Sequence, residues 1–177
     1  MTGTVFRLGD HAPARAARMP SLDPGHLHEI HAQPDDRAAA LAFALGRGGT
    51  GKALLVRLAR RGRRTVPSGE GLVLLGIDPA RLVLVEAGDE RDLLRAGLEA
   101  ARCPGIGLVL LETRGRCPGY DLTASRRLAL AARRSRTSVV VLRHEAEPRP
   151  SVAQTRWAVA AAPSRALDGG APGWPAL

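Results

Sequence analysis

The stretch that decides the fold class is Leu82-Val-Leu-Val-Glu-Ala87, with the helix that Asp89 begins directly after it. Six mostly apolar residues have the length of a buried strand, and Asp is a common residue at a helix N-cap. The same unit recurs as a strand over 107–113 with a helix that Asp121 begins, and a further strand covers 138–143. Strands that alternate with helices of this length predict parallel pairing through right-handed crossovers. We therefore expect a three-layer α/β fold with a mostly parallel central sheet flanked by helices.

The N-terminal half extends this pattern. Residues 27–32 alternate as a short strand does, residues 35–45 are rich in the helix formers Ala and Leu, and residues 53–59 form an apolar run of strand length. Residues 72–75 are compatible with a short strand or with one or two helical turns. Residues 154–159 are more polar and are expected to add a late strand at the sheet edge.

Chain length and local composition predict one folded unit. A chain of 177 residues suffices for one domain with a real core. Residues 1–25 lack periodicity and are expected to form an irregular or mobile leader, and residues 26–165 are expected to form the domain. Residues 166–177 are rich in Gly and Pro, which predicts a disordered tail.

The charge of the chain leaves two interpretations open. A formal net charge of +9 is typical of proteins that contact nucleic acid or acidic membranes. The basic residues are almost all Arg, however, and Lys52 is the single Lys, which also fits a GC-rich genome. Two arginine clusters could contact a phosphate backbone, although solvated helix and loop faces are the commoner explanation: Arg60, Arg61, Arg63 and Arg64, and Arg126, Arg127, Arg133, Arg134 and Arg136.

No metal site or membrane segment is expected. His26 and His28 would share one face of a strand, but His28-Glu-Ile-His31 is one residue short of the helical H-E-x-x-H pattern. Two cysteines are too few for a zinc cluster. The sequence also lacks a long apolar segment and the layout of a signal peptide, so we expect a cytoplasmic protein. We also expect no cofactor.

One glycine-rich segment resembles a phosphate-binding loop. Residues Gly46-Arg-Gly-Gly-Thr-Gly51-Lys52 match G-x-x-x-x-G-K, but Ala53 stands where a magnesium-binding hydroxyl belongs. A working loop follows a strand and opens a helix, whereas this segment is expected to follow a helix and precede a strand. The structural interpretation is a helix C-terminus that uses glycine. The alternative is an ATPase that uses Gly46, Gly51 and Lys52 with Glu112, the acid that ends the apolar run Leu108-Val-Leu-Leu.

Four sequence blocks resemble the ImuA family of bacterial mutagenesis proteins. They are Leu27-His-Glu-Ile30, Gly76-Ile-Asp-Pro-Ala-Arg-Leu82, Asp121-Leu-Thr-Ala-Ser-Arg-Arg-Leu-Ala-Leu130 and Gln154-Thr-Arg-Trp-Ala-Val159. The third block and the Thr-Arg-Trp strand are the more specific. The resemblance covers roughly residues 26–165 and implies a RecA-like domain that supports damage-inducible, error-prone translesion synthesis. It also implies two partners, a Y-family-polymerase-like mutagenesis protein and an error-prone replicative-type polymerase.

The resemblance also implies a different position for the phosphate loop. In RecA-like domains the first strand runs directly into this loop, which places it at Ala32-Gln-Pro-Asp35-Asp36-Arg37-Ala38-Ala39. Ala38 stands where the Lys belongs, Ala39 replaces the hydroxyl, and the segment has no Gly. Asp35 and Asp36 put negative charge at the helix N-terminus that would receive phosphate, where we expect them to act as caps.

These observations lead to one main expectation and two alternatives. We expect a non-catalytic RecA-like accessory protein that acts through protein–protein contacts in the SOS response, with no nucleotide cofactor and no catalytic residue. An ATPase that uses Gly46 to Lys52 and an Arg-rich DNA-binding module remain the alternatives.

Overall fold

The computed structural model describes residues 21–48, 51–59 and 66–162. A sheet of six parallel strands forms its centre. The strand order is β3-β2-β4-β5-β1-β6, and every neighbouring pair is parallel. The strands are β1 (Leu27–Ala32), β2 (Lys52–Leu58), β3 (Leu82–Ala87), β4 (Ile106–Arg114), β5 (Ser138–His144) and β6 (Thr155–Ala158).

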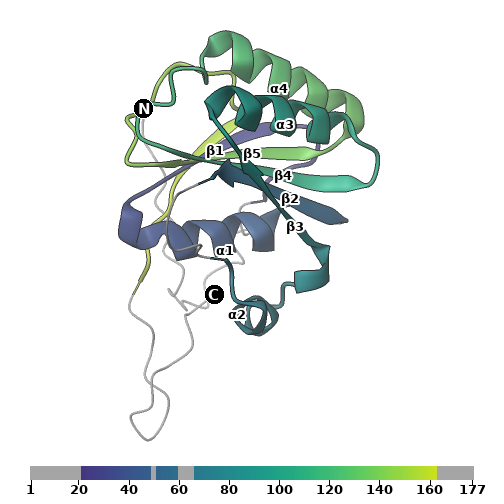
Figure 1. The fold of residues 1–177 in the computed structure, drawn as a ribbon, viewed down its shortest axis with the longest axis vertical. Helices are drawn as coiled ribbons and strands as arrows, with labels where there is room; N and C mark the ends of the chain where they lie inside the picture. The colour runs from purple at the N-terminus through teal and green to yellow at the C-terminus, as the bar shows by residue number, and fades with distance from the viewer. Residues whose placement is uncertain (1–20, 49–50, 60–65, 163–177) are drawn as a thin grey trace, which may run out of the picture.

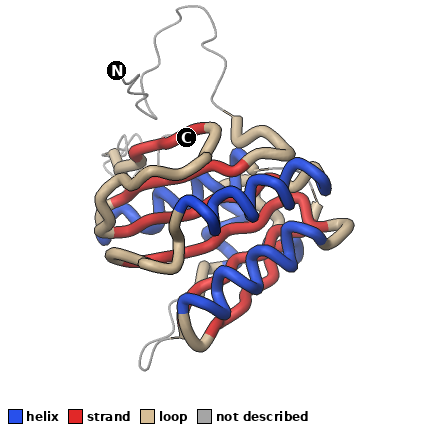
Figure 2. The backbone as a smooth tube through the Cα atoms, turned by 90° about the horizontal axis from the view of Figure 1, so that it is seen from above, coloured by secondary structure: helices blue, strands red, loops and turns tan. Residues whose placement is uncertain are grey.

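Helices cover both faces of this sheet. Helices α3 (Glu90–Arg102) and α4 (Leu122–Ser135) lie on one face, and α1 (Arg37–Arg47) and α2 (Gly69–Leu74) lie on the other (Figure 1). From above, α3 and α4 run side by side over the sheet (Figure 2). The predicted caps are present, since Asp89 Oδ1 accepts a hydrogen bond from Asp92 N (2.8 Å) and Asp121 Oδ1 accepts one from Ala124 N (2.7 Å).

Each face of the sheet has its own apolar core. Leu93 of α3 and Leu128 of α4 pack with alternate residues of β4 and β5, such as Val109 and Val141. The intervening residues of these strands pack against α1. Because β5 is buried along its whole length, it needs apolar side chains on both faces, which explains the unbroken run Val139-Val-Val-Leu142. The expected three-layer α/β fold class with a parallel central sheet flanked by helices is confirmed.

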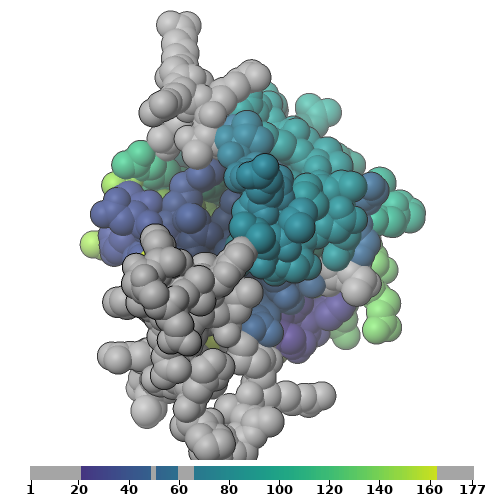
Figure 3. Space-filling view, turned by 90° about the horizontal axis from the view of Figure 1, so that it is seen from below, coloured from purple at the N-terminus to yellow at the C-terminus, as the bar shows by residue number. Residues whose placement is uncertain are grey.

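The ambiguous segment over 72–75 is helical through Leu74, and Leu75 is the C-cap residue of that helix. It belongs to α2, where Ser68 Oγ caps the helix by accepting a hydrogen bond from Gly71 N (3.3 Å). From below, α2 and the segment that follows it form the surface next to α1 (Figure 3). Val73 and Leu74 of this short helix are exposed, so the apolar run does not indicate a buried strand.

The start of α1 differs from the prediction. A 3-10 turn over Pro34–Asp36 precedes α1, and Asp36 occupies the N-cap position without a side-chain capping bond. Its backbone angles, φ −89° and ψ 4°, depart from the extended conformation that suits an N-cap. Asp36 Oδ1 instead accepts a hydrogen bond from Ala161 N (2.7 Å), so the expected capping by Asp36 was wrong.

The packed part of the chain begins before His26. Leu22 is 1% exposed, its N donates to Arg47 O (3.2 Å), and its O accepts a hydrogen bond from Ser138 Oγ (2.9 Å). The rest of the expected leader, residues 1–20, and the expected tail lie outside the described residues. Within the described part of the chain, no helix has both the length and the apolar character that a membrane crossing requires.

Candidate functional site at the carboxyl edge of the sheet

Parallel pairing brings the carboxyl ends of all the strands to one edge of the sheet. In folds of this kind, ligands bind beyond these strand ends. Glu112 near the end of β4 and His144 at the end of β5 lie at this edge, on the face that α1 covers. This is the edge at which a nucleotide site would be built.

The segment that the family resemblance assigned to the phosphate loop leads into this edge. Ala32 ends β1, the 3-10 turn follows, and Arg37 is the first residue of α1. The segment therefore forms the strand–turn–helix connection that a phosphate loop requires. Ala38 is exposed and Ala39 is half-buried, and neither side chain can bind phosphate or ligate magnesium.

Arg37 forms a two-point ion pair with Glu112. Arg37 Nη2 donates to Glu112 Oε2 (2.8 Å), and Arg37 Nε donates to Oε1. His144 Nε2 lies 3.2 Å from the same Oε1. The Glu112 side chain is only 11% exposed, so both of its oxygens face groups of the chain itself.

The surroundings of Glu112 keep it ionised. Burial alone would raise its pKa, but the adjacent His144 and Arg37 lower that pKa from 4.5 to about 2. In a nucleotide hydrolase, an acid at a strand end holds magnesium, and a loop cation contacts the outer phosphates. Here the cation at the start of α1 is directed at the acid, so the two groups neutralise each other.

A second buried carboxylate lies on the opposite face of the sheet. Glu29 of β1 is fully buried, and its Oε1 accepts a hydrogen bond from Tyr120 Oη (2.8 Å). Its Oε2 accepts one from Arg156 Nε (2.9 Å), and Arg156 is its register partner on β6. His31 Nε2 lies 3.6 Å from Oε2. This network ties the edge strand β6 and the loop before α4 to β1.

The Glu29 network is also held in its charged form. Burial alone would raise the pKa of Glu29, but hydrogen bonds from His31, Ser151, Tyr120 and Arg156 lower it to about 2. Burial and the neighbouring Glu29 raise the pKa of Tyr120 far above its usual range, so its hydroxyl remains a donor. The fully buried Arg143 adds a cation 5.8 Å from the centre of the Tyr120 ring.

The glycine-rich segment around Gly46 connects α1 to β2, as the sequence predicted. Gly46 lies within the last turn of α1, and Lys52 begins β2, where its Nζ donates to Ala80 O (2.9 Å). Arg57, five residues after Lys52, is the register partner of Glu112. At about 3.3 Å per residue, Lys52 and Glu112 lie roughly 16 Å apart along the strands. The structure does not bring together the residues of the alternative ATPase site.

Other predicted site residues have local roles or lie outside the described residues. His28 Nδ1 lies 2.8 Å from Thr155 Oγ1, and its Nε2 lies 3.1 Å from Asp23 O. In residues 21–48, 51–59 and 66–162, no three His, Cys, Asp or Glu side chains are grouped so as to hold a metal. The first cluster of candidate DNA contacts falls outside these ranges (Arg60, Arg61, Arg63 and Arg64), whereas the second lies on α4 and at its C-cap, Arg136.

Comparison with known proteins gives structural likenesses at low sequence identity. No family model matches the sequence, and no curated protein matches it. The structure is similar to that of SulA from Pseudomonas aeruginosa, with 18% identity, a TM-score of 0.49, and coverage of 67% of this chain and 97% of SulA. It is also similar to the RadB recombinase, with 19% identity, a TM-score of 0.47, and coverage of 69% of this chain and 62% of RadB.

Sequence reasoning missed His144 and the Glu29 network. His144 follows an apolar strand as Glu112 does, and this shared position is the signal that could have linked them. Glu29 is an acid inside a short strand, and the Arg of the Thr-Arg-Trp strand could have been considered as its counter-ion. The first link requires that β4 pairs with β5, and the second requires that β1 pairs with β6; the local sequence encodes neither pairing.

Proposed function

We propose that this chain is a non-catalytic RecA-like accessory protein of the DNA damage response that acts through protein–protein contacts. Its context would be damage-inducible, error-prone translesion synthesis, with a Y-family-polymerase-like protein and an error-prone replicative-type polymerase as partners. The basis for this context is the resemblance of the Asp121–Leu130 block and the Thr-Arg-Trp strand to the ImuA family.

The observation that carries the non-catalytic part is the ion pair between Arg37 and Glu112. To bind a nucleoside triphosphate with magnesium, the site would need backbone N–H groups at the start of α1 and a free acid at the end of β4. In this chain the acid is already neutralised by Arg37 and lies 3.2 Å from His144. Asp35 and Asp36 add negative charge where phosphate would approach. The fold supports a protein scaffold rather than nucleotide chemistry.

Nucleotide binding is the direct test of this part. A fluorescent ATP analogue with magnesium is titrated against the full chain, and a protein with an intact phosphate loop is assayed in parallel. We expect no saturable binding and no ATP hydrolysis, and the Lys52→Ala variant should behave in the same way. Saturable binding by the wild-type chain that disappears in Lys52→Ala would establish the ATPase instead.

Partner copurification tests the cellular role. The tagged full chain is expressed in cells with and without DNA damage, and the bound proteins are identified. We expect damage-dependent recovery of the Y-family-polymerase-like partner, and deletion of the chain should lower damage-induced mutation. The Lys52→Ala variant should restore mutation to the wild-type level. A chain that recovers neither polymerase would contradict the proposal.

A further inference from the structure

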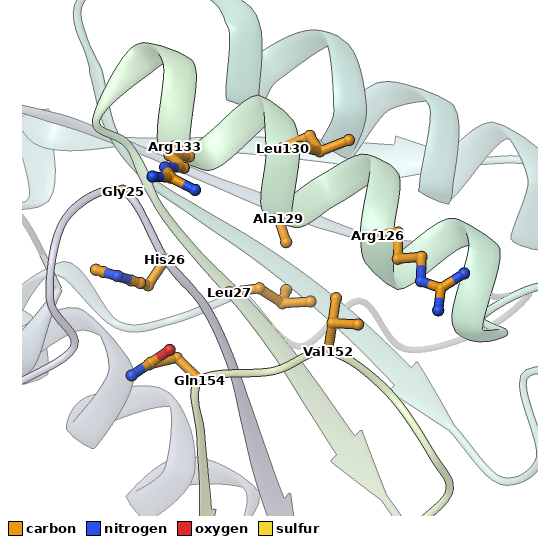
Figure 4. A pocket seen from close by; sticks show the side chains of 9 residues that line it. All are labelled: Gly25, His26, Leu27, Arg126, Ala129, Leu130, Arg133, Val152 and Gln154. Carbon is orange, nitrogen blue, oxygen red and sulfur yellow. The ribbon is translucent and has the colours of Figure 1, made fainter.

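A groove lies beside α4, next to the amino-terminal end of β1 and thus away from the carboxyl-edge site. Its volume is about 620 Å³. Arg126, Leu130 and Arg133 line it from α4, Leu27 lines it from β1, and Val152 and Gln154 line it from the segment before β6. Figure 4 shows Leu27 and Ala129 between the two arginines, with His26 and Gln154 toward the Arg133 end.

The groove combines an apolar centre with positive ends. Leu130 is 56% exposed and Val152 is 38% exposed, although both are apolar. Arg126 and Arg133 are separated by seven residues of α4, or about 10 Å along the helix axis. The lining contains no Asp or Glu, and among the described residues neither arginine forms an ion pair. Between Leu122 and Ser135, α4 itself contains no acidic residue.

We propose that this groove binds an acidic segment of a partner protein. Apolar side chains of that segment would pack on Ala129, Leu130 and Val152, and its carboxylates would face Arg126 and Arg133. This inference deepens the proposed accessory function, since it names a surface for the protein–protein contacts on which that function rests. Complementary charge would steer the partner, and apolar burial in the centre would retain it.

The lining favours a peptide over a nucleic acid. No Phe, Tyr or Trp lines the groove, and the His26 ring at one end is the one aromatic group of the lining, so successive bases would have no platform on which to stack. The centre is aliphatic, which suits Leu, Ile, Val or Phe side chains of a peptide. Two arginines about 10 Å apart can pair with two carboxylates that flank these apolar side chains in the peptide.

The test is a selection of random 12-residue peptides displayed on phage, performed on the immobilised full chain. We expect the enriched peptides to combine at least two Asp or Glu residues with apolar residues. One synthetic enriched peptide is then titrated by fluorescence polarisation against wild type and two charge-reversal variants. The groove variant is Arg126→Glu with Arg133→Glu, and the matched control is Arg127→Glu with Arg134→Glu. The control has the same spacing on the same helix, at exposed positions outside the lining.

The groove variant should weaken binding by at least about tenfold, whereas the control should change it less than about threefold. A milder pair, Arg126→Ala with Arg133→Ala, and a melting curve for each variant guard against a folding defect. The proposal is overturned if no peptide is enriched, if the enriched peptides lack acidic residues, or if both reversal variants weaken binding equally. If residues 163–177 of the same chain occupied the groove, no peptide would be enriched, and the proposal would be overturned in that case too.

Nucleic acid is tested as the competing ligand. A labelled 24-nucleotide single strand and a 24-base-pair duplex are titrated at two salt concentrations. Salt-sensitive binding that depends on Arg126 and Arg133 more than on Arg127 and Arg134 would overturn the peptide proposal. Copurification by the wild-type chain tests the accessory function separately, because it detects binding through any surface.

Discussion

Arg37 and Glu112 are 75 residues apart in sequence, yet they form a two-point ion pair at the carboxyl edge of the sheet. Arg37 is placed by the first strand-to-helix connection, and Glu112 is placed by a central strand. Their side chains are 31% and 11% exposed, so the pair is largely shielded from solvent. The position that a nucleotide would need is thereby used to join α1 to β4.

This pair should be energetically coupled. Replacing Arg37 by Ala leaves a largely buried carboxylate without its cation, and we expect the free energy of unfolding to fall by about 2 kcal/mol. In a double-mutant cycle with Glu112→Gln, the coupling energy should be about 1–2 kcal/mol by urea denaturation. Arg95→Ala, an exposed change on α3, should alter stability by less than about 0.5 kcal/mol. Strictly additive effects of the two changes would show that the pair contributes nothing.

Stability should fall in acid. The pKa of Glu112 and that of Glu29 are both lowered from 4.5 to about 2 in the folded chain. A lowered folded pKa favours the ionised native state, so the stabilisation is complete above the unfolded value and is lost as pH falls from about 5 toward 2. Each group should contribute up to roughly 3 kcal/mol over that range.

The measurement is the urea midpoint of unfolding between pH 7 and pH 3. Glu112→Gln should flatten the decline, because it removes one of the two titrating groups. A variant with the same pH dependence as wild type would mean that Glu112 does not titrate as this geometry requires.

The elements that the sequence predicted best depend on local signals. Strand β3 and helix α3 follow from an apolar run and from the Asp89 cap, both of which lie within a few residues. The apolar run of α2 is too short to distinguish a helix from a strand, and the deciding signal is the Ser68 cap before it. The glycine-rich segment that resembles a phosphate-binding loop lies between a helix and a strand, as predicted, because helix and strand signals flank it in the sequence.

The candidate site was only half predictable. Arg37 and Glu112 were each identified, but in different hypotheses: one belonged to a degenerate loop, and the other to an ATPase with Lys52. What joins Arg37 to Glu112 is the strand order, in which β4 and β5 lie between β2 and β1. Contacts between distant segments depend on this topology, which local periodicity does not determine.

The Glu29 network should hold the edge strand β6 in place. Arg156→Ala leaves a fully buried carboxylate without its cation, and we expect a loss of about 2–3 kcal/mol. Tyr120→Phe removes one hydrogen bond to Glu29 and should cost about 1 kcal/mol. Arg127→Ala on the exposed face of α4 is the control and should change little.

Hydrogen exchange gives a local measure of this effect. The amides of Gln154 and Val159 donate to Leu27 O (2.7 Å) and His31 O (2.9 Å) at the two ends of the β6–β1 pairing. In Arg156→Ala these amides should exchange faster, by more than the loss of global stability explains. If protection of β6 falls only in step with the rest of the sheet, the network does not specifically anchor this strand.

Two glycine substitutions should have opposite effects on stability. A Cβ at Gly46 would have no neighbour within 4 Å, so Gly46→Ala should stabilise α1 by about 0.5–1 kcal/mol. A Cβ at Gly97 of α3 would lie 2.7 Å from Leu111 Cδ1 and closer still to Cδ2. Because Leu111 is fully buried, Gly97→Ala should destabilise by about 1–3 kcal/mol despite the higher helix propensity of Ala.

Thermal melting distinguishes the two variants, with an expected shift of about 2–4 °C per kcal/mol for a chain of this size. Gly46→Ala carries a second meaning, since a working phosphate loop depends on its first glycine for the close approach of its backbone to phosphate. A more stable variant with unchanged behaviour in the nucleotide titration would identify Gly46 as an ordinary residue of the last helical turn. Destabilisation at Gly46 would instead require a backbone conformation there that Ala cannot adopt, contrary to the helix described.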